Sequence, residues 1–317
     1  PAIAPYNPCV LVGHDTRQSA RKLTFIAHET IDACGIQFND LGYITTPELH
    51  FAVTQVNMNQ SQDIYPYTLY LTEAYRLALQ NTCNTCNTCN TCTELHVDCA
   101  NGVGVYKLLR MKQNLLELGL HLVLYNTGDG KLNFECGAEY VEKEHKFPSN
   151  MQDINEYTRC CSLDGDADRI VYFTKINGRF EILNGDKIAC LFVKYLSQHT
   201  SSQYSIGLIQ TAYSNGASTK YIADNFKNVQ IQCTHTGVQH LHKAAHNFDI
   251  GVYFEANGHG TVLFNNKNIT AFSQLSKILS QVTGDAIGNM LAIEYILLTS
   301  MTFDEWINLY KDYYTKQ

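Results

Sequence analysis

The densest group of ionisable side chains in the sequence is the run at residues 164–169, which reads DGDADR. Its three carboxylates, at alternate positions on a short glycine-containing loop, can direct their oxygens to one point. Such a set of oxygen ligands suits a hard divalent cation, either Mg²⁺ or Ca²⁺. Without a cation this much negative charge repels itself. The spacing therefore predicts a cation site, and a solvated acidic turn between two strands is the simpler alternative.

The residues around this loop narrow the choice of cation site. An EF-hand beginning at Asp164 needs glycine at its sixth position and glutamate at its twelfth, where this chain has Arg169 and Lys175. An EF-hand is therefore excluded. Arg169 beside a bound cation indicates a phosphate as the shared ligand, because both groups neutralise phosphoryl oxygens.

A second polar loop occupies residues 254–260, with the sequence FEANGHG. Glu255, Asn257 and His259 alternate with small residues, so a carboxylate, an amide and an imidazole can meet one polyhydroxylated ligand. The alternative is a β-turn whose polar groups only satisfy its own backbone. These residues alone do not decide between the two interpretations.

Two further segments resemble ligand-binding turns. Residues 11–19 (LVGHDTRQS) lead from a strand into a helix, where Arg17 can reach a phosphate and Ser19 can cap the helix or contact the phosphate. We favour capping for Ser19. Residues 101–104 (NGVG) lack the third glycine of a dinucleotide fingerprint, since Lys107 stands in its place, so we interpret them as a turn from sheet to helix.

The one low-complexity segment is a fourfold Asn-Thr-Cys repeat that contains Cys83, Cys86, Cys89 and Cys92. The spacing resembles that of an iron–sulfur loop, which makes an iron–sulfur protein an alternative for this chain. Perfect triplets, however, are typical of the expansion of a short coding repeat. We therefore predict an inert surface loop between two structured segments.

The rest of the chain alternates short apolar runs with amphipathic stretches, which is typical of β-α units around mostly parallel sheets. We expect strands at 9–12, 95–99, 121–125, 158–163, 170–173, 206–211, 229–233 and 250–254. We expect helices at 17–33, 66–80, 105–118, 187–198, 218–226, 238–246 and within 285–314.

Composition excludes several classes of protein. With 317 residues, of which 45% are hydrophobic and 17% charged, the chain is long enough for two or three domains and too apolar to be disordered. A net charge of −7 leaves no basic excess for a nucleic acid or an anionic membrane. The strongest apolar run, 290–298, is interrupted by Glu294, and residues 1–8 show no signal peptide. We therefore expect a cytoplasmic protein with no nucleic-acid or membrane partner.

Taken together, these segments resemble the α-D-phosphohexomutases, and most closely the members that act on N-acetylglucosamine phosphates. The resemblance is carried by residues 12–19, 97–102, 164–169, 185–189, 210–213 and 254–261. The DGDADR loop resembles the metal loop of the whole superfamily. The EANGHG sequence at 255–260 resembles the acetylglucosamine members in particular, whereas glucose and mannose relatives typically carry a Ser-Gly-His version.

The resemblance implies an α/β fold of consecutive α/β/α domains with mixed or parallel sheets. The division of the chain that we expect is the rear part of domain I at 1–80, the repeat insertion at 81–93, domain II with the metal loop at 94–184, domain III with the sugar loop at 185–298, and a linker toward a fourth domain at 299–317.

The resemblance also implies an intramolecular phosphotransferase, an isomerase of the pathway to UDP-N-acetylglucosamine. A phosphoserine donates its phosphoryl group to an N-acetylhexosamine phosphate, giving a bisphosphate that reorients and returns the other phosphoryl group. The implied roles are Mg²⁺ binding by Asp164, Asp166 and Asp168, sugar binding by Glu255, Asn257 and His259, support of the phosphoserine by Arg169, and a position near phosphate for Arg17.

The sequence departs from the family pattern at several points. It contains neither the Thr-Ala-Ser-His-Asn-Pro loop with the reactive serine nor the Arg-Pro-Ser-Gly-Thr loop of the fourth domain. Gln239 and His235 stand where relatives usually have lysine, which removes positive charge from a region expected to face phosphate. We therefore expect this chain alone to be inactive, because the nucleophile is absent. The alternative is a non-catalytic sugar-phosphate-binding fragment or regulatory paralogue.

Overall fold

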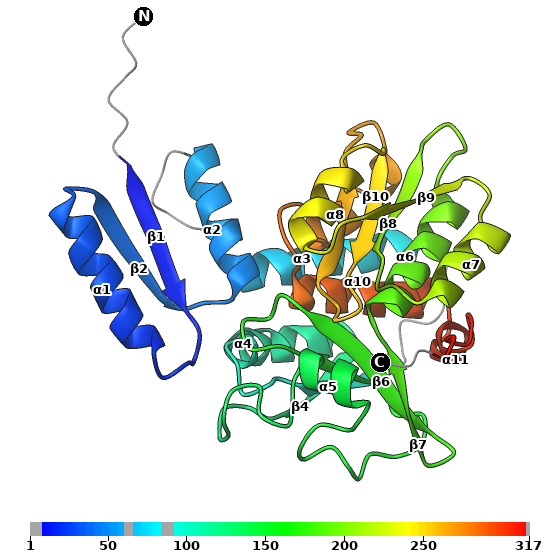
Figure 1. Ribbon diagram of the computed structural model, residues 1–317, viewed down its shortest axis with the longest axis horizontal. Helices are drawn as coiled ribbons and strands as arrows, with labels where there is room; N and C mark the ends of the chain where they lie inside the picture. The colour runs from blue at the N-terminus through cyan, green and yellow to red at the C-terminus, as the bar shows by residue number, and fades with distance from the viewer. Residues whose placement is uncertain (1–7, 60–65, 84–91, 315–317) are drawn as a thin grey trace, which may run out of the picture.

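A computed structural model describes residues 8–59, 66–83 and 92–314, and the strands within these residues form three sheets (Figure 1). The smallest sheet pairs β1 (Cys9–His14) with β2 (Gln37–Tyr43) in parallel. Helix α1 (Ala20–Ala33) connects the two strands, and α2 (Thr46–Asn59) follows β2. Strand β2 and helix α2 were not predicted.

Helix α1 begins later than the sequence indicated, and its first turn lacks the expected cap. Ser19 does occupy the N-cap position, but its side chain makes no capping hydrogen bond, so the capping prediction is wrong. A capping residue normally has extended backbone angles, whereas Ser19 is already helical, with φ −75° and ψ −17°. The turn before the helix is closed by Asp15 instead, whose Oδ1 accepts a hydrogen bond from the Arg17 amide at 3.0 Å.

The second sheet has the strand order β4-β3-β5-β6-β7. In that order the strands span Leu120–Tyr125, Thr93–Asp98, Cys160–Leu163, Ile170–Ile176 and Arg179–Leu183. Residues 101–104 form the predicted turn into α4 (Gly104–Glu117), which leads to β4. Strands β5 and β6 are antiparallel, with Leu163 opposite Ile170, so the acidic loop at 164–169 joins the predicted pair of strands.

The third sheet has the order β11-β10-β8-β9. In that order the strands span Gly260–Phe264, Ile250–Phe254, Ile206–Thr211 and Val229–Thr234. Helix α6 (Gly185–His199) precedes β8, α7 (Gly216–Asn225) connects β8 to β9, and α8 (Val238–Ala245) connects β9 to β10. Alternate residues of β10 pack into different clusters: Val252 and Phe254 join the cluster that contains α6, whereas Tyr253 joins the one that contains α8. Helices therefore cover both faces, as an α/β/α layer requires.

The largest apolar cluster ties the two larger sheets together. It contains side chains of α3 (Tyr67–Cys83), α4, α6 and α10 (Ala286–Thr299) as well as strands of both sheets. Shorter helices complete the described chain: α5 (Ala138–Glu144), a 3₁₀ turn at Thr270–Phe272, α9 (Leu275–Ile278) and α11 (Phe303–Ile307). Because packed interiors resist shear, the loops at the ends of these two sheets hold a fixed relation to each other.

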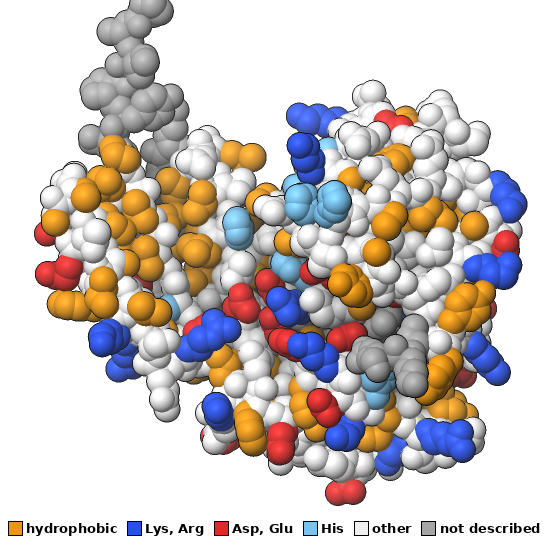
Figure 2. Space-filling model, in the orientation of Figure 1, with side chains coloured by type: hydrophobic (Ala, Val, Ile, Leu, Met, Phe, Trp, Pro, Cys, Tyr) orange, Lys and Arg blue, Asp and Glu red, His pale blue; other side chains and the backbone are white. Residues whose placement is uncertain are grey.

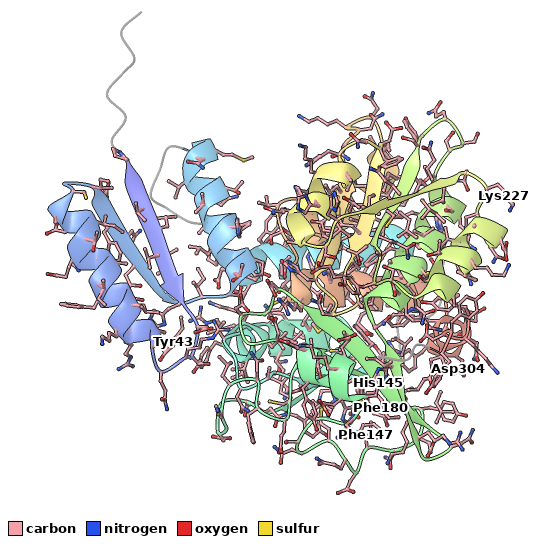
Figure 3. All side chains as sticks on the ribbon, viewed as in Figure 1. Tyr43, His145, Phe147, Phe180, Lys227 and Asp304 are labelled. Atoms are coloured by element: carbon pink, nitrogen blue, oxygen red, sulfur yellow. The ribbon has the colours of Figure 1, made fainter. Side chains whose placement is uncertain are left out.

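A smaller apolar cluster packs α5 and the adjoining loop against β5, β6 and β7. Figure 3 labels two of its aromatic side chains, Phe147 and Phe180, whose ring centroids lie 4.9 Å apart in an edge-to-face arrangement. Edge-to-face pairs add about 0.5–1.5 kcal/mol to the burial of the rings. This cluster covers the second face of the sheet whose strands β5 and β6 carry the acidic loop.

None of the helices in the described residues is long and apolar enough to cross a lipid bilayer. Of the cysteine repeat, Cys83 ends α3 and Cys92 is an exposed free thiol, whereas Cys86 and Cys89 lie outside the described residues. The prediction of an inert loop therefore stays a prediction.

Helix α10 begins at a buried carboxylate that links it to α3. Asp285 accepts hydrogen bonds from the Gly288 amide at 2.9 Å and from the Tyr67 hydroxyl at 2.7 Å. Burial raises the pKa of Asp285 to about 6. The folded chain therefore takes up a proton at this carboxyl at a higher pH than the unfolded chain, in which the pKa is near 3.9.

This shift predicts a pH dependence of stability. Between pH 7.5 and pH 5 the folded state gains a proton at Asp285 that the unfolded state does not, so the free energy of unfolding should rise by about 1 kcal/mol from this group. Asp285→Asn should lack this increment, because an amide does not titrate. Urea unfolding of both proteins at the two pH values measures the difference, with the exposed Asp153→Asn as control. An equal pH response in the wild type and Asp285→Asn would contradict the prediction.

Candidate functional site

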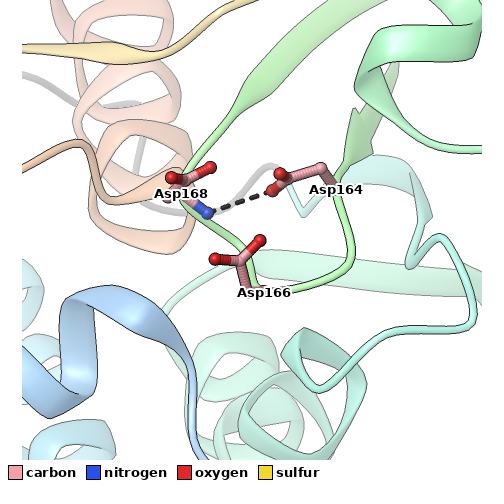
Figure 4. Close-up of side chains that lie close together, drawn as sticks. All are labelled: Asp164, Asp166 and Asp168. Carbon is pink, nitrogen blue, oxygen red and sulfur yellow. Dashed lines mark hydrogen bonds between the residues drawn. The ribbon is translucent and has the colours of Figure 1, made fainter. Parts of the chain in front are cut away.

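The acidic loop gathers its three aspartates at one point (Figure 4). Asp164, Asp166 and Asp168 each offer a carboxylate oxygen, and these oxygens all lie within 4.8 Å of one another. The Oδ1 atom of Asp164 accepts hydrogen bonds from the backbone amides of Asp168, at 3.0 Å, and Arg169, at 3.1 Å. The backbone thus curls around Asp164, with Ala167 in the left-handed region at φ +57°.

The electrostatics of this loop favour a bound cation. Burial, and then the charges of Asp168 and Asp166, raise the pKa of Asp164 well above its usual range. In addition, Asp168 Oδ1 is buried and has no hydrogen-bond partner among the described residues. A divalent cation would neutralise the repulsion and satisfy this oxygen. The donor set therefore fits a metal ion of the hard, oxygen-preferring class.

Close backbone packing holds the acidic loop in place. The Val103 amide donates a hydrogen bond to the Gly165 carbonyl at 3.0 Å. A Cβ atom on Gly102 would lie 2.3 Å from the same oxygen, so only glycine permits this approach. The turn at 101–104 is therefore a support for the acidic loop, a role that its sequence did not reveal.

A buried carboxylate behind the loop was also not singled out from the sequence. Asp98 ends β3 and accepts hydrogen bonds at 2.7–3.0 Å from the Ala100 and Gly137 amides, the Asn126 side-chain amide and the Ser162 hydroxyl. These bonds connect the end of β3 to the residue after β4, to the start of α5 and to β5. Two features of the sequence could have pointed to Asp98: it ends an expected parallel strand, and it lies within residues 97–102, which carry part of the resemblance.

Residues 255–259, named here the sugar-type loop after the resemblance, lie between β10 and β11 and form a tight turn. The Glu255 amide donates to the His259 carbonyl at 2.9 Å, and Asn257 Oδ1 accepts from the His259 amide at 3.0 Å. The turn interpretation therefore accounts for the Asn257 oxygen. It does not account for His259 Nε2, which is buried without a hydrogen-bond partner among the described residues. This nitrogen is available to a ligand.

The acidic loop and the sugar-type loop lie side by side, although they are far apart in the sequence. Arg169 and His259 form an antiparallel β-bridge, and the Ile170 amide donates to the Gly258 carbonyl at 3.3 Å. His259 Nε2 lies 3.7 Å from Asp168 Oδ2. The structure thus brings the three aspartates and the histidine into one site.

The start of α6 fixes the sugar-type loop from a second direction. The Gly185 amide donates to the Ala256 carbonyl at 3.0 Å, and a Cβ atom on Gly185 would lie 1.8 Å from the Glu255 carbonyl oxygen. The Glu255 side chain accepts a hydrogen bond from the Gly237 amide at 3.3 Å. His235 and Gln239 are exposed on either side of Gly237, so the two positions that differ from the family pattern flank the loop that contacts Glu255.

Arg169 lies at the edge of the aspartate group. Its Nε atom is 3.6 Å from Asp168 Oδ1 and 3.8 Å from Asp164 Oδ2, and its Nη1 atom is 3.8 Å from Glu139. All three separations exceed those of close ion pairs, and Nε makes no hydrogen bond within the described residues. The guanidinium therefore retains donors for an anion.

Arg17 approaches the site from the smallest sheet. It forms an ion pair with Asp15 at 2.5 Å and lines a cavity of about 390 Å³ whose wall includes Asp166. At the start of α2, Thr46 donates its hydroxyl to Asp166 Oδ2 at 2.5 Å and its amide to the Asp166 carbonyl at 3.1 Å. The sequence analysis missed Thr46 because it did not predict α2.

Comparisons with known proteins agree with this arrangement. Three family models match: "Phosphoglucomutase/phosphomannomutase, alpha/beta/alpha domain I" at residues 2–65, and domains II and III of "Phosphoacetylglucosamine mutase AMG1" at 58–171 and 184–276. The human phosphoacetylglucosamine mutase is 41% identical over 97% of this chain and 61% of its own length, and the Candida albicans protein is 36% identical over 96% of this chain and 60% of its own. The chain thus spans about three fifths of these relatives.

Solved structures show the same likeness. A crystal structure of N-acetylglucosamine-phosphate mutase in its substrate complex aligns with a TM-score of 0.87 at 33% identity, over 96% of this chain and 62% of that one. The Aspergillus fumigatus N-acetylphosphoglucosamine mutase, in complex with GlcNAc-6P and magnesium, aligns with a TM-score of 0.87 at 36% identity, over 98% and 63%. The chain belongs to the phosphoacetylglucosamine mutase family of the α-D-phosphohexomutase superfamily.

Proposed function

We propose that this chain forms the metal and sugar part of the active site of a phosphoacetylglucosamine mutase, which interconverts the 6-phosphate and 1-phosphate of N-acetylglucosamine. The observation that carries the proposal is the β-bridge between Arg169 and His259, which joins the acidic loop to the sugar-type loop. A single sugar phosphate can therefore contact both loops. The solved relative with bound GlcNAc-6P and magnesium supports this choice of ligands.

In this proposal Asp164, Asp166 and Asp168 hold Mg²⁺, which supplies charge neutralisation at the phosphoryl group being transferred. Arg169 donates hydrogen bonds to the same phosphoryl oxygens, because its Nε is unpartnered beside the aspartates. Arg17 lines the adjoining cavity with Asp166 and binds a phosphate there. These groups act by positioning and by charge.

Glu255, Asn257 and His259 orient the sugar in this proposal. Glu255 is held by the Gly237 amide, and His259 Nε2 is free to bond a hydroxyl. Because the loop is fixed by backbone contacts to β6 and α6, these side chains keep one geometry relative to the metal loop. Such preorganisation lowers the entropic cost of aligning the substrate.

The domain division expected from the sequence becomes part of the proposal, with one change. The strands of the second sheet fall within 93–183 and those of the third within 206–264, which supports boundaries near 93 and 184. Helix α3, however, packs against α4, α9 and α10. We therefore place the end of domain I between α2 and α3. We keep 299–317 as the predicted linker toward a fourth domain, although within it Trp306 of α11 is buried in the largest apolar cluster. We also keep the cytoplasm as the location, because the cysteines whose side chains are described are all free thiols.

Calorimetric titration of this chain with N-acetylglucosamine 6-phosphate and MgCl₂ tests the proposal. Glu255→Ala and His259→Ala should each weaken binding by about tenfold or more, since each removes hydrogen bonds worth about 1.5–3 kcal/mol when a charged group takes part. Glu117→Ala, an exposed carboxylate on α4, should bind as the wild type does. Equal affinity for glucose 6-phosphate would contradict the assignment to the acetylglucosamine branch.

Turnover is tested in a chain that contains these residues together with the reactive-serine loop of the relatives. Conversion of the 6-phosphate to the 1-phosphate is the expected result. Binding without conversion would favour the non-catalytic sugar-phosphate-binding alternative.

A further inference from the structure

Two histidines on α8 face each other outside the site described above. His242 lies in the last turn of the helix, and His246 is its C-cap, one turn further along. Their Nε2 atoms are 3.2 Å apart. Figure 2 shows histidine side chains gathered on the surface over α8. His246 is an exposed residue.

The contacts of Asn265 determine which ring nitrogen of neutral His246 carries the hydrogen. The Asn265 side-chain nitrogen donates hydrogen bonds to the carbonyls of Ala245, at 3.0 Å, and Phe248, at 2.8 Å. Its oxygen must therefore face His246 Nδ1, 2.7 Å away, and that nitrogen must carry the hydrogen. In neutral His246 the lone pair is consequently on Nε2, directed at His242.

His242 has a similar partner on its other ring nitrogen. Its Nδ1 atom lies 2.8 Å from the hydroxyl of Tyr253, a fully buried residue at the end of β10. The contact between the two Nε2 atoms is a hydrogen bond when His242 Nε2 carries the hydrogen and the Tyr253 hydroxyl donates to His242 Nδ1. In the other tautomer His242 Nδ1 donates to the tyrosine oxygen, and His242 Nε2 carries a lone pair. Both lone pairs then point into the same space, and each ring is held from behind by an oxygen.

We propose that His242 and His246 together bind a divalent transition-metal ion of the class of Zn²⁺, Cu²⁺ or Ni²⁺. Two metal–nitrogen bonds of about 2.0–2.1 Å span the observed 3.2 Å at roughly 100°, an angle that tetrahedral and octahedral sites both accommodate. Imidazole nitrogen suits these metals, whereas Mg²⁺ prefers oxygen.

The surroundings of the pair have the features of a built site. Metal-binding histidines usually donate their second ring nitrogen to an oxygen that fixes the ring, as Tyr253 and Asn265 do here. The exposure of His246 leaves the other coordination positions to water. Nothing in this proposal depends on the sugar-phosphate site, since none of the four residues belongs to it.

Copper binding to the 317-residue chain tests the proposal. Excess MgCl₂ occupies the aspartate group, and N-ethylmaleimide blocks reactive thiols before CuCl₂ is added. Pulsed electron paramagnetic resonance then counts the imidazoles on the copper through their remote nitrogens. We expect one tightly bound Cu²⁺ per chain with two imidazole ligands.

Variants assign the two imidazoles. His242→Ala and His246→Ala should each weaken Cu²⁺ binding by about 100-fold, because the second ligand no longer acts at high effective concentration. Tyr253→Phe should weaken it by about tenfold, since only the ring support is lost. His240→Ala is the matched control on the same helix and should bind as the wild type does.

A copper spectrum with one imidazole or none in the wild-type chain would overturn the proposal, and this measurement does not depend on how any variant folds. Unchanged affinity in both His242→Ala and His246→Ala would overturn it as well. So would loss of binding in His240→Ala, because the ion would then lie elsewhere on the surface.

Discussion

Asp166→Ala is expected to lower mutase turnover on the order of 1,000-fold, because a metal-stabilised charge at a phosphoryl group is worth several kcal/mol in the transition state. Asp166 contributes one of the three oxygens that lie within 4.8 Å of one another, and two carboxylates hold Mg²⁺ far less tightly than three. The rate is measured in a chain that also carries the reactive-serine loop of the relatives. Mn²⁺ binding, followed by electron paramagnetic resonance, is measured in the 317-residue chain.

The control for this variant is Asp153→Ala, an exposed aspartate of the same sheet region outside the acidic loop. It should keep both turnover and Mn²⁺ affinity. Retained turnover in Asp166→Ala would remove the metal role from this loop. Lost turnover with unchanged Mn²⁺ affinity would place the metal elsewhere.

Stability in Mg²⁺-free buffer separates a metal effect from misfolding. Asp166→Ala loses the hydrogen bond from the Thr46 hydroxyl, worth about 1 kcal/mol, but it also relieves the repulsion that Asp166 exerts on Asp164. These effects oppose each other, so we expect the free energy of unfolding to change by less than about 1 kcal/mol. A larger loss, seen in urea unfolding, would mean that the variant is damaged rather than metal-deficient.

Gly258→Ala is expected to destabilise the chain by about 3 kcal/mol or more, and to weaken sugar-phosphate binding at the same time. Gly258 has φ +86°, and a Cβ atom there would lie 1.9 Å from the Ile170 carbonyl oxygen. The methyl group can be accommodated only if the sugar-type loop moves away from the start of β6. That movement separates His259 from Asp168. Urea unfolding and calorimetric titration measure the two effects.

Gly178→Ala provides a matched control for the backbone strain. Gly178 also has a positive φ, +74°, but a Cβ atom there would meet nothing within 4 Å. Its replacement should therefore cost only the left-handed strain, about 1–2 kcal/mol, and should leave sugar-phosphate affinity unchanged. Equal destabilisation by the two substitutions would show that the contact between Gly258 and Ile170 contributes nothing measurable.

Much of the secondary structure could be predicted because the signals are local. The strands that are buried on both faces, such as Ile206–Thr211 and Ile250–Phe254, contain short apolar runs (IGLI and IGVYF) that a sequence pattern reveals. Strand β2 (Gln37–Tyr43) is polar and partly exposed, so its sequence gave no comparable signal.

Strand β7 was missed although a signal was present. Asn177 and Gly178 both have positive φ and form the two-residue turn between β6 and β7. An Asn-Gly pair between apolar residues is typical of such a hairpin. The sequence of α2 has no clear apolar stripe, so this helix was not predicted. Thr46, which begins α2 and donates a hydrogen bond to Asp166, was therefore missed as well.

The sequence by itself determined the chemistry of each loop. Three aspartates within five residues make a group of carboxylates in almost any turn, and the same holds for the carboxylate, amide and imidazole of residues 255–259. Helical spacing likewise places His242 and His246 on one side of α8. These are properties of neighbouring residues, so no knowledge of the fold is needed to see them.

Only the tertiary structure decided which loops meet. The bridge between Arg169 and His259 exists because α3, α6 and α10 pack the second and third sheets into one apolar cluster. The ring of His246, at the end of α8, is likewise oriented by Asn265, which directly follows β11. Such contacts join residues distant in the chain, and their geometry is set by how side chains fill a shared interior, which no local pattern encodes.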